Sequence, residues 1–142
     1  MADIRHTIQI SAPAESVRRS VSTAAGLTEW WASDVTETDG AVDLGFFNRQ
    51  TIYRLKLQRN DPDRIEWLCE SGKEWAGTRL IFTLDQKDGA STSVRLTHAG
   101  WASDTDYFVS CTTTWGELMF RLKAAAEGKS RGPLFLPGSL AY

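Results

Sequence analysis

Hydrophobic and polar residues alternate over most of the first hundred positions, and this period of two predicts β-strands. The first run, residues 3–10, places Ile4, His6, Ile8 and Ile10 on one face and polar residues on the other. Further alternating runs are separated by turn signals such as Asp88-Gly89. The inward positions of these later runs are Val42, Leu44 and Phe46; Tyr53, Leu55 and Leu57; Ile65, Trp67 and Cys69; Leu80, Phe82 and Leu84; and Val94, Leu96 and His98. We therefore expect about six antiparallel strands after the first.

Two short helices are predicted immediately after the first strand. Pro13 suits a first helical turn, and Val17 and Val21 lie four residues apart, so a helix is expected over about 13–21. Thr23 is a candidate N-cap for a second helix that ends at Trp30 and Trp31. These helices interrupt an otherwise antiparallel strand pattern.

A change to helical periodicity after residue 103 predicts one long helix over about 104–128. Ser103 and Asp106 have capping-box-like spacing, and Gly128 is a natural stop. Such a helix is roughly 35 Å long. The residues on its apolar face are Phe108, Cys111, Trp115, Leu118, Met119, Leu122 and Ala126. Gly and Pro preclude more helix in the tail, 129–142.

Together these elements predict an α+β fold in which a curved antiparallel sheet of about 6–7 strands wraps around the long C-terminal helix. The length of 142 residues suits a single domain, 1–142, with its own core.

Composition narrows the function classes. The net charge is −2, from 16 basic and 18 acidic residues that are intermixed, so no nucleic-acid partner is expected. No segment reads as a signal peptide or membrane span, so we expect a soluble cytoplasmic protein with no membrane partner. Cys69 and Cys111 are expected to be reduced and buried; a disulfide or a nucleophilic thiol is the alternative.

Chemical motifs are scarce in this chain. Two histidines without clustered Cys, Asp or Glu do not supply a zinc ligand set, so no metal is expected. No Gly-rich phosphate loop and no G-x-S-x-G turn is present, and no cofactor is implied. The six tryptophans are unusual, because each buries roughly 150–250 Å² and needs either a dense core or an aromatic cavity.

Four segments carry a family resemblance: IQISAPAESV at 8–17, LTEWW at 27–31, LTHAGW at 96–101 and TTTWGELMFRLKAAAEG at 112–128. With the element order, they resemble the helix-grip fold of the START-like (SRPBCC) superfamily and, within it, the family of homologues of the activator of heat-shock protein 90 ATPase. The resemblance implies a ligand-sized cavity between the sheet and the long helix. The superfamily includes lipid and hormone binders, cyclases and dehydratases, and oxygenase subunits.

Inward parity selects the candidate pocket residues. Trp101 follows the last strand and Trp75 lies between two strands, and both are expected at the rim of the cavity. His6 and His98 share parity with apolar residues and are expected near each other at one end of the cavity; the alternative is two independently satisfied histidines. The predicted ligand-binding residues are Trp31, Phe46, Tyr53, Trp67, Phe82, His6, His98, Trp101, Cys111, Trp115 and Met119. The alternative for the aromatic residues is that they simply fill the core.

Three function hypotheses remain open. The leading one is a protein that binds a small hydrophobic or aromatic ligand in the cavity. The second is an enzyme of cyclase or dehydratase type that uses a cavity histidine as general acid or base. The third is a co-chaperone-like interaction protein. Val109 and Phe120 lie off the apolar stripe of the long helix, so either the apolar tail at 133–136 or a homodimer partner is expected to cover them.

Overall fold

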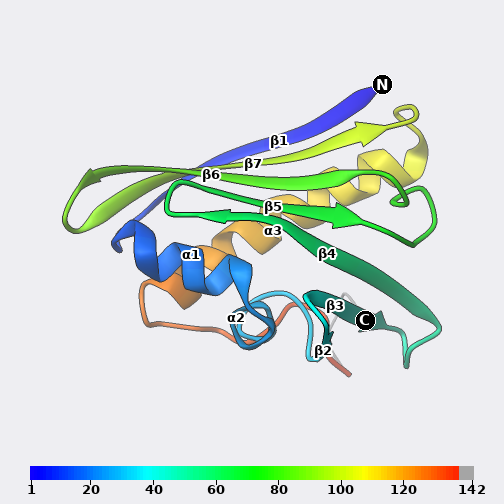
Figure 1. Cartoon of the computed structure of the whole chain (residues 1–142), viewed down its shortest axis with the longest axis horizontal. Coiled ribbons are helices and arrows are strands. Elements are labelled where there is room, and N and C mark those ends of the chain that lie inside the picture. The colour runs from blue at the N-terminus through cyan, green and yellow to red at the C-terminus, as the bar shows by residue number, and fades with distance from the viewer. Residues whose placement is uncertain (138–142) are drawn as a thin grey trace.

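The protein is described by a computed structural model in which residues 1–137 are placed. Seven strands and three helices follow one another along the described chain (Figure 1). The elements are β1 (Ala2–Ile10), α1 (Ala14–Ser22), α2 (Ala24–Thr28), β2 (Asp34–Thr38), β3 (Ala41–Phe46), β4 (Thr51–Asp61), β5 (Arg64–Cys69), β6 (Arg79–Asp88), β7 (Ser91–Trp101) and α3 (Asp106–Ala126). The predicted α+β order, with two short helices after the first strand, is confirmed.

All seven strands form one antiparallel sheet in the order β1-β7-β6-β5-β4-β3-β2. The chain runs through β2 to β7 as successive neighbours, and β1 pairs with β7 at the far edge. The register pairs Ile4 with His98 and His6 with Leu96. The two histidines are therefore diagonal neighbours on one face, about 7–8 Å apart at Cα.

Helix α3 crosses one face of the sheet, as Figure 1 shows. Its N-cap is Thr105, whose hydroxyl accepts a hydrogen bond from the backbone N–H of Phe108 at 3.2 Å. The helix therefore begins slightly later than predicted. Its buried residues are Cys111, Trp115, Leu118, Met119, Leu122 and Ala125. These match the predicted stripe closely, because the stripe must face the apolar side of the sheet.

Helices α1 and α2 close one end of the sheet. Thr23 caps α2 as predicted, accepting from the N–H of Gly26 at 2.9 Å. Two indole N–H groups tie strands and helices together: Trp67 donates to the carbonyl of Val21 at 2.9 Å, and Trp30 donates to the carbonyl of Ser20 at 2.8 Å. Buried indoles normally find such partners, because an unpaired N–H is costly in a core.

The tail beyond α3 runs back across the molecule toward the segment between α2 and β2 (Figure 1). Phe135 donates to the carbonyl of Trp31 at 2.9 Å and accepts from the N–H of Ser33 at 2.9 Å. Phe120 is nevertheless 61% exposed and Val109 is 58% exposed. The described part of the tail thus covers neither Val109 nor Phe120, so the prediction that the apolar segment 133–136 covers them is wrong. Positions 138–142 of the predicted tail lie outside the described residues.

Within residues 1–137, no helix has the length and apolarity required to cross a bilayer. In the same range no group of three or more His, Cys, Asp or Glu side chains is placed to hold a metal ion. Cys69 and Cys111 are both free and buried, as predicted.

Candidate functional site: a pocket between α3 and β3–β4

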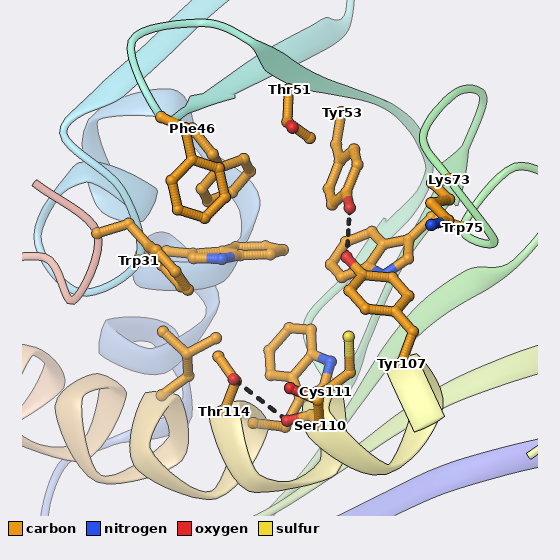
Figure 2. Close-up of a pocket in the computed structure, with 14 residues that line it drawn as sticks. Trp31, Phe46, Thr51, Tyr53, Lys73, Trp75, Tyr107, Ser110, Cys111 and Thr114 are labelled. Atoms are coloured by element: carbon orange, nitrogen blue, oxygen red, sulfur yellow. Dashed lines mark hydrogen bonds between the residues drawn. The ribbon is translucent and has the colours of Figure 1, made fainter. Parts of the chain in front are cut away.

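A pocket of about 390 Å³ lies between the first half of α3, the β3–β4 end of the sheet and the β5–β6 connection. Figure 2 shows its side chains converging from these segments. The lining residues are Trp31, Phe46, Phe47, Thr51, Tyr53, Lys73, Trp75, Tyr107, Ser110, Cys111, Thr114, Trp115, Leu118 and Phe135. Aromatic rings dominate this set, and only one member carries a formal charge.

Helix α3 supplies one wall of the pocket. Tyr107, Cys111 and Trp115 are spaced by four residues and therefore stack along one side of the helix. Ser110 and Thr114 lie beside them, and the Thr114 hydroxyl donates to the backbone carbonyl of Ser110 at 3.3 Å, as drawn in Figure 2. This wall is rotated slightly from the stripe that packs on the sheet, so the same helix serves both the core and the pocket.

The β5–β6 connection supplies the opposite wall by folding back over β4. Gly72 has a φ of +118°, and a Cβ there would lie 2.4 Å from the ring of Tyr53. Only glycine allows both this backbone conformation and this close approach. The fold-back buries Trp75, whose ring centroid lies 4.4 Å from that of Tyr53 and 6.1 Å from that of Trp31.

The predicted rim position of Trp75 and Trp101 is therefore wrong. Trp75 is 5% exposed and Trp101 is 1% exposed, and the two rings meet edge to face at 6.4 Å. Trp75 forms an inner wall of the pocket, whereas Trp101 lies behind it in the core. The sequence pattern placed Trp75 between strands and Trp101 at the end of a strand. Both are buried because the β5–β6 connection folds back over β4.

A pair of tyrosine hydroxyls marks one end of the pocket. The hydroxyl of Tyr53, from β4, and that of Tyr107, from α3, form a short hydrogen bond that is drawn in Figure 2. Burial raises the pKa of both phenols, and their mutual hydrogen bond further raises the pKa of Tyr107. Burial also raises the pKa of the neighbouring Cys111 thiol. All three groups are therefore protonated at neutral pH.

His98 lies behind the pocket in a fully satisfied chain of hydrogen bonds. The indole N–H of Trp115 donates to its Nδ1 at 3.2 Å, so Nε2 carries the ring proton and donates to the hydroxyl of Thr78 at 2.8 Å. Thr78 in turn donates to the carbonyl of Trp75 at 2.6 Å. His98 is 0% exposed, and burial lowers its pKa to about 3. It is a neutral structural histidine.

His6 makes a separate contact with α3. Its Nε2 donates to the carbonyl of Thr112 at 3.1 Å, and its Cε1 lies 3.8 Å from the position that a Cβ on Gly116 would take. That is an ordinary van der Waals distance, so the approach of β1 to the helix here does not require a glycine. The histidines share one face of the sheet, as the strand parity predicted, but neither lines the pocket.

Five of the eleven predicted ligand-binding residues line the pocket: Trp31, Phe46, Tyr53, Cys111 and Trp115. The others do not. Trp67, Phe82, Trp101 and Met119 are buried in the core, and the histidines have the contacts given above.

Nine lining residues were not predicted to bind a ligand. They are Phe47, Thr51, Lys73, Trp75, Tyr107, Ser110, Thr114, Leu118 and Phe135. For Tyr107 a signal existed, because it precedes Cys111 by one helical turn. For Lys73 and Phe135 no periodic signal exists, because both lie outside helices and strands.

The sheet that holds a long helix, together with a pocket between them, defines a helix-grip protein. Solved structures agree. The Aha1 dimer from Colwellia psychrerythraea has a TM-score of 0.78 and 27% identity, covering 91% of this chain and 98% of that one. A protein from Mesorhizobium loti has a TM-score of 0.74 at 14% identity, covering 91% and 99%. A putative protein of the dynemicin biosynthetic locus has a TM-score of 0.69 at 16% identity, covering 90% of this chain and 48% of that one.

No family model and no curated protein matches the sequence. The solved structures nevertheless confirm the resemblance stated from the motifs: this chain is similar in sequence and fold to the Aha1 protein from Colwellia psychrerythraea and has the helix-grip fold. The low-identity structures add support for the fold alone.

Proposed function

We propose that this protein binds a small hydrophobic or aromatic molecule in the pocket between α3 and β3–β4. The observation that carries the proposal is a pocket of about 390 Å³ whose walls are mainly aromatic. Pockets for small organic ligands typically measure about 300–1,000 Å³ and combine apolar walls with a few polar groups. This pocket lies at the small end of that range, which favours a compact ligand of one to three rings.

The walls are held in place without a ligand. The ring of Trp31 packs against Trp115 at 5.1 Å and Trp30 at 5.5 Å, and Phe46 packs against Tyr53 at 5.5 Å. Side chains that are fixed by such contacts lose little further entropy when a ligand binds. The packing therefore supports a preformed site rather than an incidental gap in the core.

Catalysis by a cavity histidine receives no such support. A general acid or base must reach the reacting atom, usually within about 3 Å or through one water. His98 has both ring nitrogens engaged, and its pKa is lowered to about 3 by burial. Neither His98 nor His6 lines the pocket. Binding is therefore favoured over the cyclase or dehydratase alternative.

The test is a titration with neutral aromatic compounds of one to three rings, followed through the fluorescence of the pocket tryptophans. Ser110→Phe places a ring into the pocket from an exposed position on α3. Arg95→Phe adds the same ring on the outer face of the sheet and is the matched control. We expect the wild type and Arg95→Phe to bind at least one compound alike, and Ser110→Phe to bind it at least about ten-fold more weakly. Equal affinity for all three proteins, or no binding at all, would contradict the proposal.

We also propose that the exposed face of α3 mediates self-association. Val109 and Phe120 are eleven residues apart and therefore lie on one side of the helix, with small Thr113 and Gly116 between them. The structure from Colwellia psychrerythraea is described as a dimer. Phe120→Glu should convert a dimer to a monomer in light scattering without a large change in melting temperature, because this side chain is 61% exposed. A wild-type monomer, or a dimer that survives the substitution, would contradict this.

A further inference from the structure

The protein leaves hydrogen-bond donors unused at the tyrosine end of the pocket. Tyr53 and Tyr107 have two O–H protons between them, and their mutual bond uses only one. The Trp75 indole N–H is buried with no hydrogen-bond partner. The Cys111 thiol lies close enough to the Trp75 indole and to the Tyr107 hydroxyl for both to lower the pKa of the thiol, against the larger effect of burial. A thiol is only a weak acceptor. This end of the pocket therefore has O–H and N–H donors whose only nearby protein partner beyond the tyrosine pair is a weak acceptor.

A positive charge stands beside these donors. Figure 2 shows Lys73 on the same side of the pocket as Tyr53, Trp75 and Tyr107. Lys73 is exposed, lines the pocket and makes no ion pair with any residue of 1–137. The acidic neighbour Glu74 lies near enough to raise the pKa of Tyr53, but its carboxylate accepts a hydrogen bond from Thr105 at 2.5 Å and does not line the pocket.

The other end of the pocket is apolar. Trp31 and Phe46 lie across the pocket from the tyrosine pair in Figure 2. Phe135 meets the ring of Phe46 edge to face at 5.0 Å, and Leu118 completes this end. The pocket is thus asymmetric, with a donor-rich, cation-bordered end and an end made of rings and methyl groups.

We infer that the ligand is an aromatic carboxylic acid, bound with its ring against Trp31, Phe46 and Phe135 and its carboxylate at the tyrosine end. A carboxylate offers only acceptors, on two oxygens, so it can take the surplus O–H of the Tyr53–Tyr107 pair. Its negative charge is attracted to the Lys73 ammonium group at the rim of the pocket. This inference rests on the proposed binding function and adds the chemical class of the ligand.

The experiment compares naphthoic acid with naphthamide, which has nearly the same shape but no charge, by isothermal titration at neutral pH. We expect the wild type to bind the acid about ten-fold more tightly, since charge-assisted hydrogen bonds exceed neutral ones and an exposed ion pair adds a smaller amount. Lys73→Met should reduce affinity for the acid by about two- to five-fold and leave the amide unchanged. Lys129→Met, beyond the end of α3, is the matched control and should change neither.

Two further variants test the assignment of roles. Replacing both tyrosines by phenylalanine, Tyr53→Phe with Tyr107→Phe, removes both O–H donors and should remove most of the preference for the acid, whereas either single variant still leaves one free O–H and should keep part of it. Glu74→Gln keeps an acceptor for Thr105 but removes the opposing charge, so it should strengthen binding of the acid. Equal affinity of the wild type for acid and amide overturns this inference and leaves the proposed function standing. Failure of both compounds, and of the neutral panel, counts against the proposed function itself. Because Lys73 is exposed, its variant remains informative even if the double tyrosine variant does not fold.

Discussion

The buried histidine predicts a specific pH dependence of stability. Burial lowers the pKa of His98 from an ordinary 6.5 to about 3. Between these values the unfolded chain binds a proton at this site and the native protein does not. The free energy of unfolding must therefore fall as the pH falls through this window, by about 1.4 kcal/mol per pH unit once the unfolded histidine is mostly protonated. Above about pH 6.5 the contribution of His98 is fully present.

The magnitude follows from those two pKa values. From pH 7 to pH 4.5 this single site should lower the free energy of unfolding by about 2–3 kcal/mol. That is a large part of the about 5–15 kcal/mol that stabilises an ordinary domain. Carboxylates also titrate over this range, so the measured quantity is the difference between the wild type and a variant that lacks only His98.

We propose His98→Gln, measured by urea unfolding at several pH values between 7 and 4.5. The variant keeps a polar side chain but loses the paired bonds to Trp115 and Thr78, so it should be less stable at pH 7 by about 1–3 kcal/mol. Its further loss on acidification should be about 2–3 kcal/mol smaller than that of the wild type. Parallel pH curves for the two proteins would refute the reasoning. So would a His6→Gln variant that removed the dependence instead.

Three further predictions concern the walls of the pocket. Gly72→Ala combines a φ of +118° with a clash, so it should lower the free energy of unfolding in urea by more than about 2 kcal/mol. Gly40→Ala is the control: this residue has a φ of +76° but nothing within 4 Å of a Cβ, so the loss should be about 1 kcal/mol. Equal losses would show that the close approach of Gly72 to Tyr53 is not the cause. Cys111 lines the pocket, so it should react slowly with iodoacetamide and be protected by a bound aromatic compound. Cys69, whose pKa is raised to about 12 by burial, should not react in the native protein. Mass spectrometry of peptides distinguishes the two cysteines. Phe135→Ala should speed ligand release in stopped-flow fluorescence with little loss of stability, because this ring is only partly buried, and an unchanged rate would show that the tail does not retain the ligand.

The fold was predictable because its two periods are clear. Alternation with a period of two defined the strands, and the long apolar stripe after residue 103 required a concave partner surface. Local signals also worked where the side chain acts on its own backbone, as in the cap formed by Thr23. The start of α3 was displaced because Thr105, which is extended, makes the capping bond to the N–H of Phe108, and the helix begins at Asp106 rather than after Ser103.

Parity alone could not separate pocket residues from core residues. Tyr53, Trp67 and Phe82 all point to the same face of the sheet, so the alternation of their strands predicts each of them equally well as a pocket residue. What separates them is position along the sheet: Trp67 lies under α1, where its indole bonds the carbonyl of Val21, whereas Tyr53 lies at the end that α1 and α2 leave uncovered. That difference depends on where helices lie over strands, which is a tertiary property with no local signal.

Trp75 shows why the core and the pocket of this protein cannot be treated separately. Its ring forms an inner wall of the pocket, and its backbone carbonyl ends the hydrogen-bond chain that begins at Trp115 and passes through His98 and Thr78. Trp115 also lines the pocket, so both ends of this buried chain belong to pocket residues. Movement of the Trp115 ring, or of the Trp75 backbone, would have to break a buried hydrogen bond, which costs about 1–3 kcal/mol. The tyrosine end of the pocket is thereby held rigid, whereas the opposite end includes a tail segment held by a few backbone bonds, and ligand access is expected there.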